Sequence, residues 1–195
     1  MEIELLERQS SELRKDIVEV CYHSKAGHVG GSLSAIDILN VLYFNELRID
    51  PNNPKMENRD RFILSKGHIA EALYVTLAKR GFFAYSELDN FSGYNTKYIG
   101  HPNNKVAGVE MNTGALGHGL AIGVGLAIAA KKMGQDYRTY VLMGDGELAE
   151  GSIWESAMAA GHYKLDNLCA IVDRNHLQIS GCTETVMTLE DLKGK

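Results

Sequence analysis

The hydrophobic and polar positions toward the N-terminus predict two amphipathic helices. Apolar residues recur every three or four positions over residues 4–25, and Gly27 is expected to end this helix. A glycine-rich turn then precedes a second helix, for which Ser32 or Ser34 is the expected N-cap. The apolar residues of the second helix are expected to be largely buried, namely Ile36, Leu39, Val41, Leu42 and Phe44.

The middle of the chain combines regular segments with a long irregular one. "RFILSKGH" predicts a short strand that runs into a glycine turn, and "IAEALYVTLAKRG" predicts a helix. Residues 92–112 are rich in Gly, Asn and Pro and predict a loop, whose length is typical of a functional segment. Residues 115–134 predict a helix despite Gly119, Gly123 and Gly125. Each interior glycine costs about 1 kcal/mol, so we expect these glycines to allow close packing.

The last third of the chain has the pattern of a β-α-β unit. Strands are expected at 138–143 and 168–173, with a helix at 149–163 between them. Both strands are continuous hydrophobic runs, as in a parallel sheet that is covered on both faces. The predicted fold class is therefore α/β, a parallel β-sheet flanked by helices on both faces, in a single domain.

Composition and charge exclude several classes of partner. The chain has 195 residues, of which 45% are hydrophobic, and its formal charge is -5 with no clustered basic stripe. We therefore expect neither nucleic acid nor an anionic membrane as a partner. No window approaches eighteen uncharged apolar residues, and the acidic N-terminus does not resemble a secretory signal, so we expect a cytoplasmic protein. The three cysteines lack zinc or redox spacing.

Two polar side chains directly follow the strands of the β-α-β unit. Asp145 lies between Gly144 and Gly146 after the first strand, and Asn175 follows the second. The carboxyl ends of neighbouring parallel strands meet at one edge of a sheet, where ligands bind. A carboxylate, an amide oxygen and the backbone carbonyl of Leu177 are hard ligands that suit Mg²⁺, or Ca²⁺ in its place. The glycines would let a diphosphate approach backbone N–H groups.

Two alternatives to this cation site remain open at this stage. A Gly-Asp-Gly sequence after a strand is most often only a turn. "GDGELA" also fits the dinucleotide-binding pattern G-x-G-x-x-A, with Asp173 as the ribose-binding acid. However, the carboxylate of Asp145 would repel a bare pyrophosphate. Asp173 also lies further from the glycine motif than the roughly twenty residues that are typical of the ribose-binding acid. The cation-mediated interpretation accounts for more of the residues.

The motif and four further segments resemble the transketolase family. "GDGELAEG" followed by "AIVDRN" is similar to the thiamine diphosphate motif, Gly-Asp-Gly with a later Asn, in its transketolase form. "KAGHVGGSLSAIDILNVLYF", "RFILSKGHIAEALY", "GHPNNKVAGVEMNTGALGHGL" and "GDGELAEGSIWESAMAAGHYKL" have the order and approximate spacing of the diphosphate-binding domain of transketolases. The resemblance covers nearly the whole chain and implies thiamine diphosphate and Mg²⁺ as cofactors.

The resemblance also implies roles for individual histidines. His68 corresponds to a histidine beside the diphosphate, and His28 and His101 correspond to histidines of the substrate channel. There they would bind donor hydroxyls and take part in proton transfer, so all three are the candidate catalytic residues. Histidine suits this work because it titrates near neutrality and both donates and accepts hydrogen bonds.

Further residues take cofactor-binding roles through the same resemblance. Asp145 and Asn175 correspond to Mg²⁺ ligands, with the backbone oxygen of Leu177 as the third, and Gly146 to an amide that contacts the diphosphate. The remaining cofactor-binding assignments concern Gly114 and Leu116, in a segment that packs on the cofactor, and Glu150, in an acidic network between the two sites of a dimer. Glu150 could equally be a first-turn carboxylate favoured by the helix dipole.

The resemblance further implies that this chain works with a partner. Transketolases have a second domain that binds the aminopyrimidine of the cofactor, and no segment of this chain matches it. We therefore expect residues 1–195 to be a thiamine diphosphate domain, incomplete at its C-terminus, of the N-terminal subunit of a split transketolase, in a homodimer or heterotetramer that acts on sugar phosphates. The form "GHVGGSLS" suits that group. The alternatives are an enzyme like 1-deoxyxylulose-5-phosphate synthase, a non-catalytic truncated domain, and a nicotinamide dinucleotide enzyme.

Overall fold

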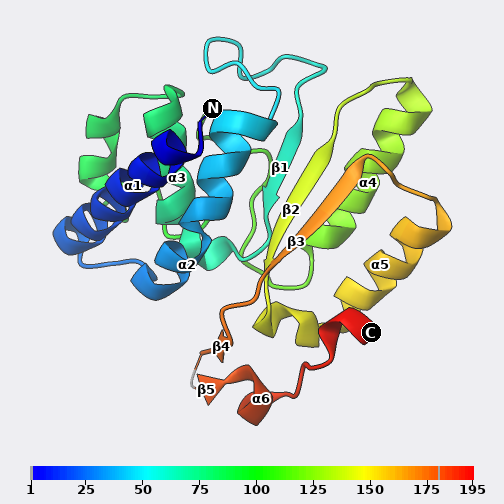
Figure 1. Cartoon of the computed structure of the whole chain (residues 1–195). Coiled ribbons are helices and arrows are strands. Elements are labelled where there is room, and N and C mark those ends of the chain that lie inside the picture. The colour runs from blue at the N-terminus through cyan, green and yellow to red at the C-terminus, as the bar shows by residue number, and fades with distance from the viewer. Residues whose placement is uncertain (1, 180) are drawn as a thin grey trace.

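A computed structural model, which describes residues 2–179 and 181–195, contains a parallel sheet between two groups of helices. Strands β1 (Arg61–Leu64), β2 (Thr139–Gly144) and β3 (Leu168–Asp173) lie in the order β1-β2-β3 (Figure 1). β2 pairs with both neighbours in parallel, with Leu64 opposite Leu142 and Gly144 opposite Asp173. The three carboxyl ends therefore lie at the same edge of the sheet, which confirms the prediction for the two strands of the β-α-β unit.

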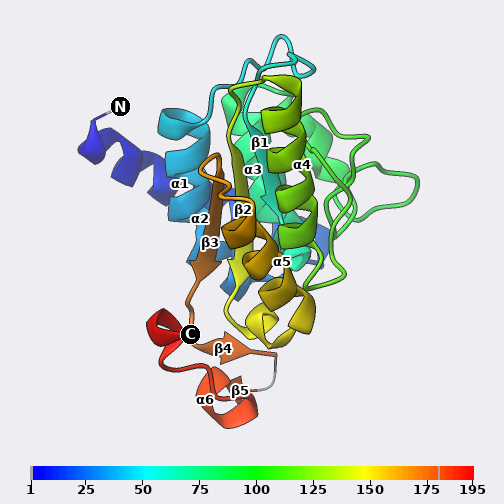
Figure 2. The same ribbon diagram turned by 90° about the vertical axis from the view of Figure 1, so that its right-hand side faces the viewer.

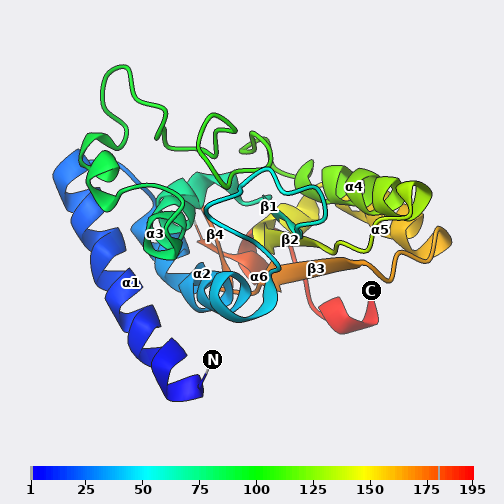
Figure 3. The same ribbon diagram turned by 90° about the horizontal axis from the view of Figure 1, so that it is seen from above.

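Helices cover both faces of this sheet (Figure 3). One group consists of α1 (Ile3–Ser24), α2 (Val29–Val41) and α3 (Ala70–Arg80), and the other of α4 (Gly119–Met133) and α5 (Gly151–His162). This arrangement confirms the predicted α/β class. Among the described residues, no helix is both long and apolar enough to span a membrane.

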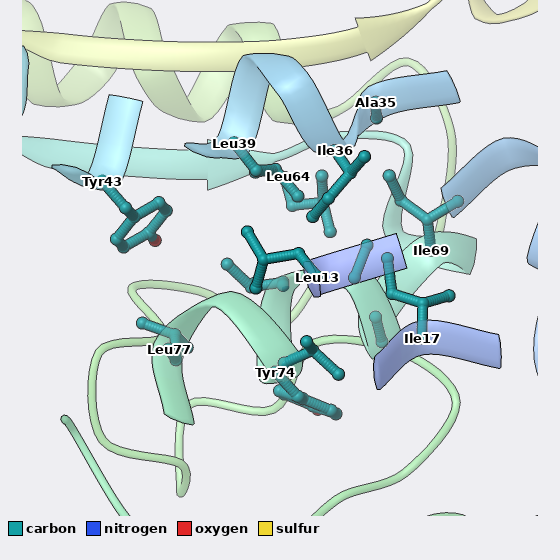
Figure 4. Packing of buried hydrophobic residues seen from close by; sticks show 14 of the residues in the cluster. Leu13, Ile17, Ala35, Ile36, Leu39, Tyr43, Leu64, Ile69, Tyr74 and Leu77 are labelled. Carbon is teal, nitrogen blue, oxygen red and sulfur yellow. The ribbon is translucent and has the colours of Figure 1, made fainter. Parts of the chain in front are cut away.

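The alternation of side chains along the strands divides the core into two clusters. In β2, Leu142 packs on the α1–α2–α3 side, whereas Val141 and Met143 pack with residues of α4 and α5. Successive side chains of a strand point to opposite faces, so a continuous apolar run supplies both clusters. The larger cluster is formed around fully buried side chains such as Leu13 and Ile17 of α1 (Figure 4).

Two of the three glycines in α4 allow the predicted close packing. A Cβ atom on Gly119 would lie 2.8 Å from the Cα atom of Ser65, and one on Gly123 would lie 2.4 Å from Cγ2 of Val141. These glycines are four residues apart and therefore face the sheet together. Gly125 has nothing within 4 Å of such a Cβ atom, so the packing explanation is wrong for this position.

Other local predictions are also corrected by the structure. α2 begins at Val29 with His28 in the N-cap position, so neither Ser32 nor Ser34 is a cap. Val41, expected to be buried, is 41% exposed. The predicted loop is confirmed, because 91–118 contains no helix or strand. β3 is less covered than predicted, and the residues of this strand that are exposed are Cys169 and Ala170.

A small C-terminal unit lies below the carboxyl edge of the sheet (Figures 1 and 2). It contains β4 (Leu177–Gln178), β5 (Gly181–Cys182) and the short helix α6 (Thr183–Val186). β4 and β5 pair in antiparallel fashion, with Leu177 opposite Cys182. This unit follows β3 directly, and Arg174, which precedes it, bonds both Asp145 after β2 and Thr183 of α6.

Candidate functional site

The carboxyl edge of the sheet is where polar residues from distant parts of the chain meet. β1 leads into Ser65, Lys66 and a 3₁₀ turn, Gly67–Ile69. β2 leads into Asp145, whose backbone N–H donates to the carbonyl of Asp173 at 3.2 Å. The backbone N–H of Lys66 likewise donates to the carbonyl of Leu142, also at 3.2 Å. The backbone itself therefore fixes the spacing of the three strand ends.

The structure brings the three predicted histidines together at this edge. His28 occupies the N-cap position of α2, and its ring centroid lies 5.3 Å from that of His68 in the 3₁₀ turn, edge to face. His101 comes from the long loop and lies against Gly114, because a Cβ atom on Gly114 would be 2.4 Å from Cδ2 of His101. A Cβ atom on Gly67 would be 2.7 Å from the backbone nitrogen of Gly114. The backbone at Gly67, next to His68, thus lies against the backbone at Gly114, and Gly114 in turn lies against His101.

The environment of His68 favours its neutral form. Burial lowers its pKa to about 4, and the nearby charges of Lys66, His28 and His101 act in the same direction. Near neutral pH, His68 therefore has one nitrogen that donates a hydrogen bond and one that accepts. His68 is half-buried whereas His28 and His101 are exposed, so the cluster has an open side.

A buried ion pair connects the histidines to the end of β3. Nζ of Lys66 lies 2.6 Å from Oδ2 of Asp173, and the hydroxyl of Ser34 donates to Oδ1 of Asp173 at 2.7 Å. Lys66 is 1% exposed and Asp173 is 6% exposed. Asp173 is thus a structural carboxylate with protein partners on both oxygens, which disfavours the dinucleotide alternative in which it binds a ribose.

The carboxylate of Asp145 is buried and surrounded by hydrogen-bond donors. Its Oδ1 accepts the backbone N–H of Gly146 at 2.8 Å. Its Oδ2 accepts both Nη1 of Arg174 and the backbone N–H of His176, each at 2.7 Å. Arg174 also bonds Glu190 and Glu184, so a cation already balances Asp145 and links it to the C-terminal unit.

Asn175 lies between β3 and β4, and Leu177 is the first residue of β4. Asn175 is half-buried, and its Oδ1 accepts the backbone N–H of Leu177 at 2.9 Å. Leu177 is 67% exposed, so its contribution to a metal site could come only from its backbone carbonyl. Within the described ranges, no three His, Cys, Asp or Glu side chains form a metal site. The donors offered here are instead carboxylate, amide and carbonyl oxygens, a set that fits Mg²⁺.

The other predicted site residues differ in their surroundings. The backbone N–H of Gly144 donates to Oε2 of Glu147 at 3.1 Å. Leu116 is half-buried in the loop before α4. Glu150 is exposed and occupies the N-cap position of α5 without a capping hydrogen bond. Its stem packs close to Gly117, where an added Cβ atom would lie 2.7 Å from Cβ of Glu150.

Sequence patterns did not identify Glu147 as a structural centre of the site. This residue is 3% exposed, and its Oε1 accepts the hydroxyl of Ser65 and the backbone N–H of Gly117. Together with its bond to Gly144, the carboxylate joins the ends of β1 and β2 to the loop before α4. The sequence shows only an acidic residue directly after the Gly-Asp-Gly turn. Acidic residues are common in the first turn of any helix, so this pattern does not by itself indicate a role in the site.

A cavity of about 270 Å³ adjoins Asp145 and Gly146. Trp154 of α5 and Gln178 of β4 contribute to its lining, as does Thr183 at the start of α6. Gln178 also packs on Gly146, where an added Cβ atom would lie 2.8 Å from its Cγ atom. The space beside the Gly-Asp-Gly turn is therefore enclosed by the C-terminal unit.

The chain matches a known protein family over nearly its whole length. Residues 7–195 match the family model described as transketolase, thiamine diphosphate binding domain. The chain is 55% identical to one of the subunits of the apulose-4-phosphate transketolase of Phocaeicola vulgatus over 195 residues, which are 100% of this chain and 69% of that protein. It is 42% identical to the SqwG subunit of the 6-deoxy-6-sulfo-D-fructose transketolase of a Clostridium species over 191 residues, covering 97% and 70%.

Solved structures show the same likeness in three dimensions. The transketolase of Campylobacter jejuni superposes with a TM-score of 0.93 at 37% identity, covering 100% of this chain and 32% of that one. The transketolase of Leishmania mexicana gives a TM-score of 0.93 at 31% identity, covering 97% and 30%. The described chain thus corresponds to about a third of these longer proteins.

Proposed function

The chain belongs to the transketolase family, as its thiamine diphosphate-binding domain, and from this premise we propose that it is the N-terminal subunit of a split transketolase. In this role it transfers a two-carbon glycolaldehyde unit from a ketose phosphate to an aldose phosphate. Thiamine diphosphate and Mg²⁺ are its cofactors, and activity requires a second chain. The observation that carries the proposal is the convergence of His28, His68 and His101 at the same strand edge as Asp145.

The metal end of the proposed site is built from Asp145, Asn175 and Leu177. Asp145 is 1% exposed, and a buried carboxylate needs a cation or several donors to offset its desolvation. Asp145 has donors and the guanidinium of Arg174 in the structure. Mg²⁺ bound by Asp145, the amide oxygen of Asn175 and the carbonyl of Leu177 would take over this charge balance, with Ca²⁺ as a substitute.

The cofactor's other contacts are proposed for the residues around the same edge. His68, Gly114, Leu116, Gly144 and Gly146 are the proposed binding residues, and Glu150 is proposed to contribute through a neighbouring subunit. Thiamine diphosphate supplies, when bound, the nucleophilic carbon and the electron sink for cleavage of a ketose carbon–carbon bond. Gly144 and Gly146 carry no side chains of their own, which suits a diphosphate beside the start of a helix, and Gln178, which packs on Gly146, would have to move aside for it.

The histidines are proposed to handle the protons of the sugar. Cleavage of a ketose removes a hydroxyl proton, and addition to an aldehyde returns one to the new hydroxyl. Neutral His68 has one acceptor and one donor nitrogen, since burial lowers its pKa to about 4. His28 and His101 are exposed and therefore available to sugar hydroxyls that enter from the open side of the cluster.

The partner and substrate proposals are supported by the names of relatives. Two relatives are named as subunits of transketolases, one acting on apulose 4-phosphate and one on 6-deoxy-6-sulfo-D-fructose. Both names describe a ketose with a phosphate or sulfonate group. We therefore assign this chain a phosphorylated ketose donor and a partner chain with the pyrimidine-binding domain, in a homodimer or a heterotetramer.

Reconstitution with the partner chain tests this function. The chain and a pyrimidine-domain partner are mixed with thiamine diphosphate and Mg²⁺, and aldose-dependent consumption of ketose phosphates is measured with a coupled assay. Transfer of a two-carbon unit supports the proposal. Pyruvate consumption in place of ketose transfer would identify an enzyme like 1-deoxyxylulose-5-phosphate synthase, and cofactor binding without any transfer would identify a non-catalytic domain.

A further inference from the structure

Glu71, on the second position of α3, is a buried carboxylate to which no role has been given. It is 0% exposed. Its Oε1 accepts the backbone N–H of His28 at 2.6 Å and the hydroxyl of Ser32 at 2.8 Å. Its Oε2 has no hydrogen-bond partner among the described residues. Burying a carboxyl group with one unpartnered oxygen costs free energy. We therefore ask which part of the structure the two hydrogen bonds to Oε1 hold in place.

The two bonds of Glu71 fix the beginning of α2. Their donors are the N-cap residue of α2 and a residue of its first turn, although Glu71 belongs to a different helix. The carboxylate lies beside the N-terminal turns of both α2 and α3, whose dipoles favour a negative charge. Glu71 thus serves as the cap that α2 lacks from its own sequence.

The turn before α2 passes close to Glu71, without space for a side chain at Gly27. Gly27 has a φ of +122°, a region that favours glycine. A Cβ atom at Gly27 would lie 2.6 Å from Sγ of Cys21 and 3.1 Å from Oε1 of Glu71. The backbone of the α1–α2 turn therefore packs between Cys21 of α1 and the carboxylate of Glu71. The position of His28, the next residue, depends on both contacts.

We infer that Glu71 is a positioning residue that sets the distance between His28 and His68. His68 and Glu71 belong to one continuous segment, the 3₁₀ turn and the first turn of α3. This segment fixes His68 directly and holds the backbone of His28 through the carboxylate. The 5.3 Å separation of the two rings follows from that connection. The inference rests on the proposed function, in which both histidines serve the sugar and the cofactor.

Two substitutions of similar size separate the hydrogen-bonding role from simple packing. Glu71→Gln keeps an acceptor oxygen for His28 and Ser32, so kcat/KM of the reconstituted pair should stay within about twofold of wild type. Glu71→Met fills the space without an acceptor, and it should lower kcat/KM for the ketose by about tenfold or more, since small misplacements of a reacting group have large effects. Most of the loss should appear as a higher KM, because His28 is proposed to bind donor hydroxyls.

A double-mutant cycle with His28→Ala identifies the route by which Glu71 acts. If Glu71 works through His28, Glu71→Met should change kcat/KM by less than about twofold in the His28→Ala background. Equal losses in the two backgrounds would show a general structural role and overturn the inference. Ser32→Ala, which removes one of the two bonds and leaves His28 anchored, is the matched control and should stay within about threefold of wild type.

A measurement independent of activity keeps the inference separate from the proposed function. In the histidine-labelled full chain, the His28 ring resonance is assigned by its loss in His28→Ala. That resonance should shift in Glu71→Met and keep its wild-type position in Glu71→Gln. An unshifted resonance in a folded Glu71→Met protein overturns the positioning role, whether or not the wild-type pair transfers a two-carbon unit. An inactive wild-type pair with the predicted shift overturns only the proposed function.

Discussion

Lys66 and Asp173 form a buried ion pair, 2.6 Å between Nζ and Oδ2, that joins the end of β1 to the end of β3 across β2. Both residues are almost inaccessible to solvent, and the hydroxyl of Ser34 on α2 adds a third partner. The pair therefore ties two strands and a helix together at the edge where the histidines and Asp145 meet. The shape of the candidate site depends on an interaction that contributes no direct contact to the sugar in our proposal.

Removing one charge of this pair should strongly destabilise the fold. Lys66→Met leaves Asp173 buried without its cation, and breaking a buried ion pair in this way costs about 3–5 kcal/mol. Urea unfolding followed by circular dichroism gives the free energy of unfolding. The double substitution Lys66→Met with Asp173→Asn should recover a large part of the loss, since no buried charge remains. Equal stability of Lys66→Met and wild type would show that the pair contributes nothing.

Two glycines of α4 should respond to alanine in opposite ways. Gly123→Ala places a methyl group 2.4 Å from Cγ2 of Val141, and overpacking of this kind costs about 1–3 kcal/mol. Gly125→Ala meets no atom within 4 Å, so its better helix propensity should raise stability by about 0.5–1 kcal/mol. Thermal unfolding of the two variants checks both signs. A stabilising Gly123→Ala would contradict the packing of α4 on β2.

The lowered pKa of His68 predicts a loss of stability toward acid. The ordinary histidine pKa is 6.5, and burial lowers the pKa of His68 to about 4 in the folded chain. Between these values the unfolded chain binds more protons, so the free energy of unfolding falls as the pH drops from about 6.5 to about 4. Above this window, the contribution of neutral His68 is fully present.

The pH effect can be assigned to His68 by comparison with a control histidine. His68→Gln should show a smaller decrease in the free energy of unfolding between pH 6.5 and pH 4 than wild type. His162→Gln, at an exposed helix position, should follow the wild-type curve. Denaturant titrations at several pH values give these curves. Parallel curves for His68→Gln and wild type would argue against a half-buried, neutral imidazole at His68.

The three cysteines should differ in their reaction with a maleimide. Cys169 and Cys182 are exposed, whereas Cys21 is 8% exposed in α1. Burial and the nearby charge of Glu71 raise the pKa of Cys21 to about 11, which leaves little of the reactive thiolate at pH 8. Mass spectrometry of the full chain should show two modified thiols, with Cys21 at least about tenfold slower until urea is added. Equally fast modification of all three would contradict the packing of α1.

The sequence predicts the parts of this fold that depend on local patterns. Continuous apolar runs identified β2 and β3, and the Gly-Asp-Gly turn with its later asparagine identified two neighbouring strand ends. The glycines of α4 indicated close packing, although they gave no reason to separate Gly125 from the others. That difference becomes clear only when the face of the helix that meets the sheet is known.

Partners that come from distant segments could not be predicted from local patterns. Lys66 bonds Asp173, which is 107 positions away, and Glu71 bonds Ser32, which is 39 positions away. The sequence predicts Ser32 or Ser34 as the N-cap of α2, because a short hydroxyl side chain commonly serves there. Instead, the carboxylate of Glu71 accepts the backbone N–H of His28, so α2 begins at Val29 without a cap of its own.

Binding of thiamine diphosphate as a function of Mg²⁺ tests the central claim most directly. Isothermal titration calorimetry on the reconstituted pair would compare wild type with Asp145→Asn and with Asp166→Asn, an exposed control of the same chemistry. We predict Mg²⁺-dependent binding for wild type and Asp166→Asn, and affinity at least about tenfold weaker for Asp145→Asn, since the amide lacks the charge that holds the cation. Binding by Asp145→Asn that matches wild type at every Mg²⁺ concentration would contradict the assignment of Asp145 and, with it, the proposed site.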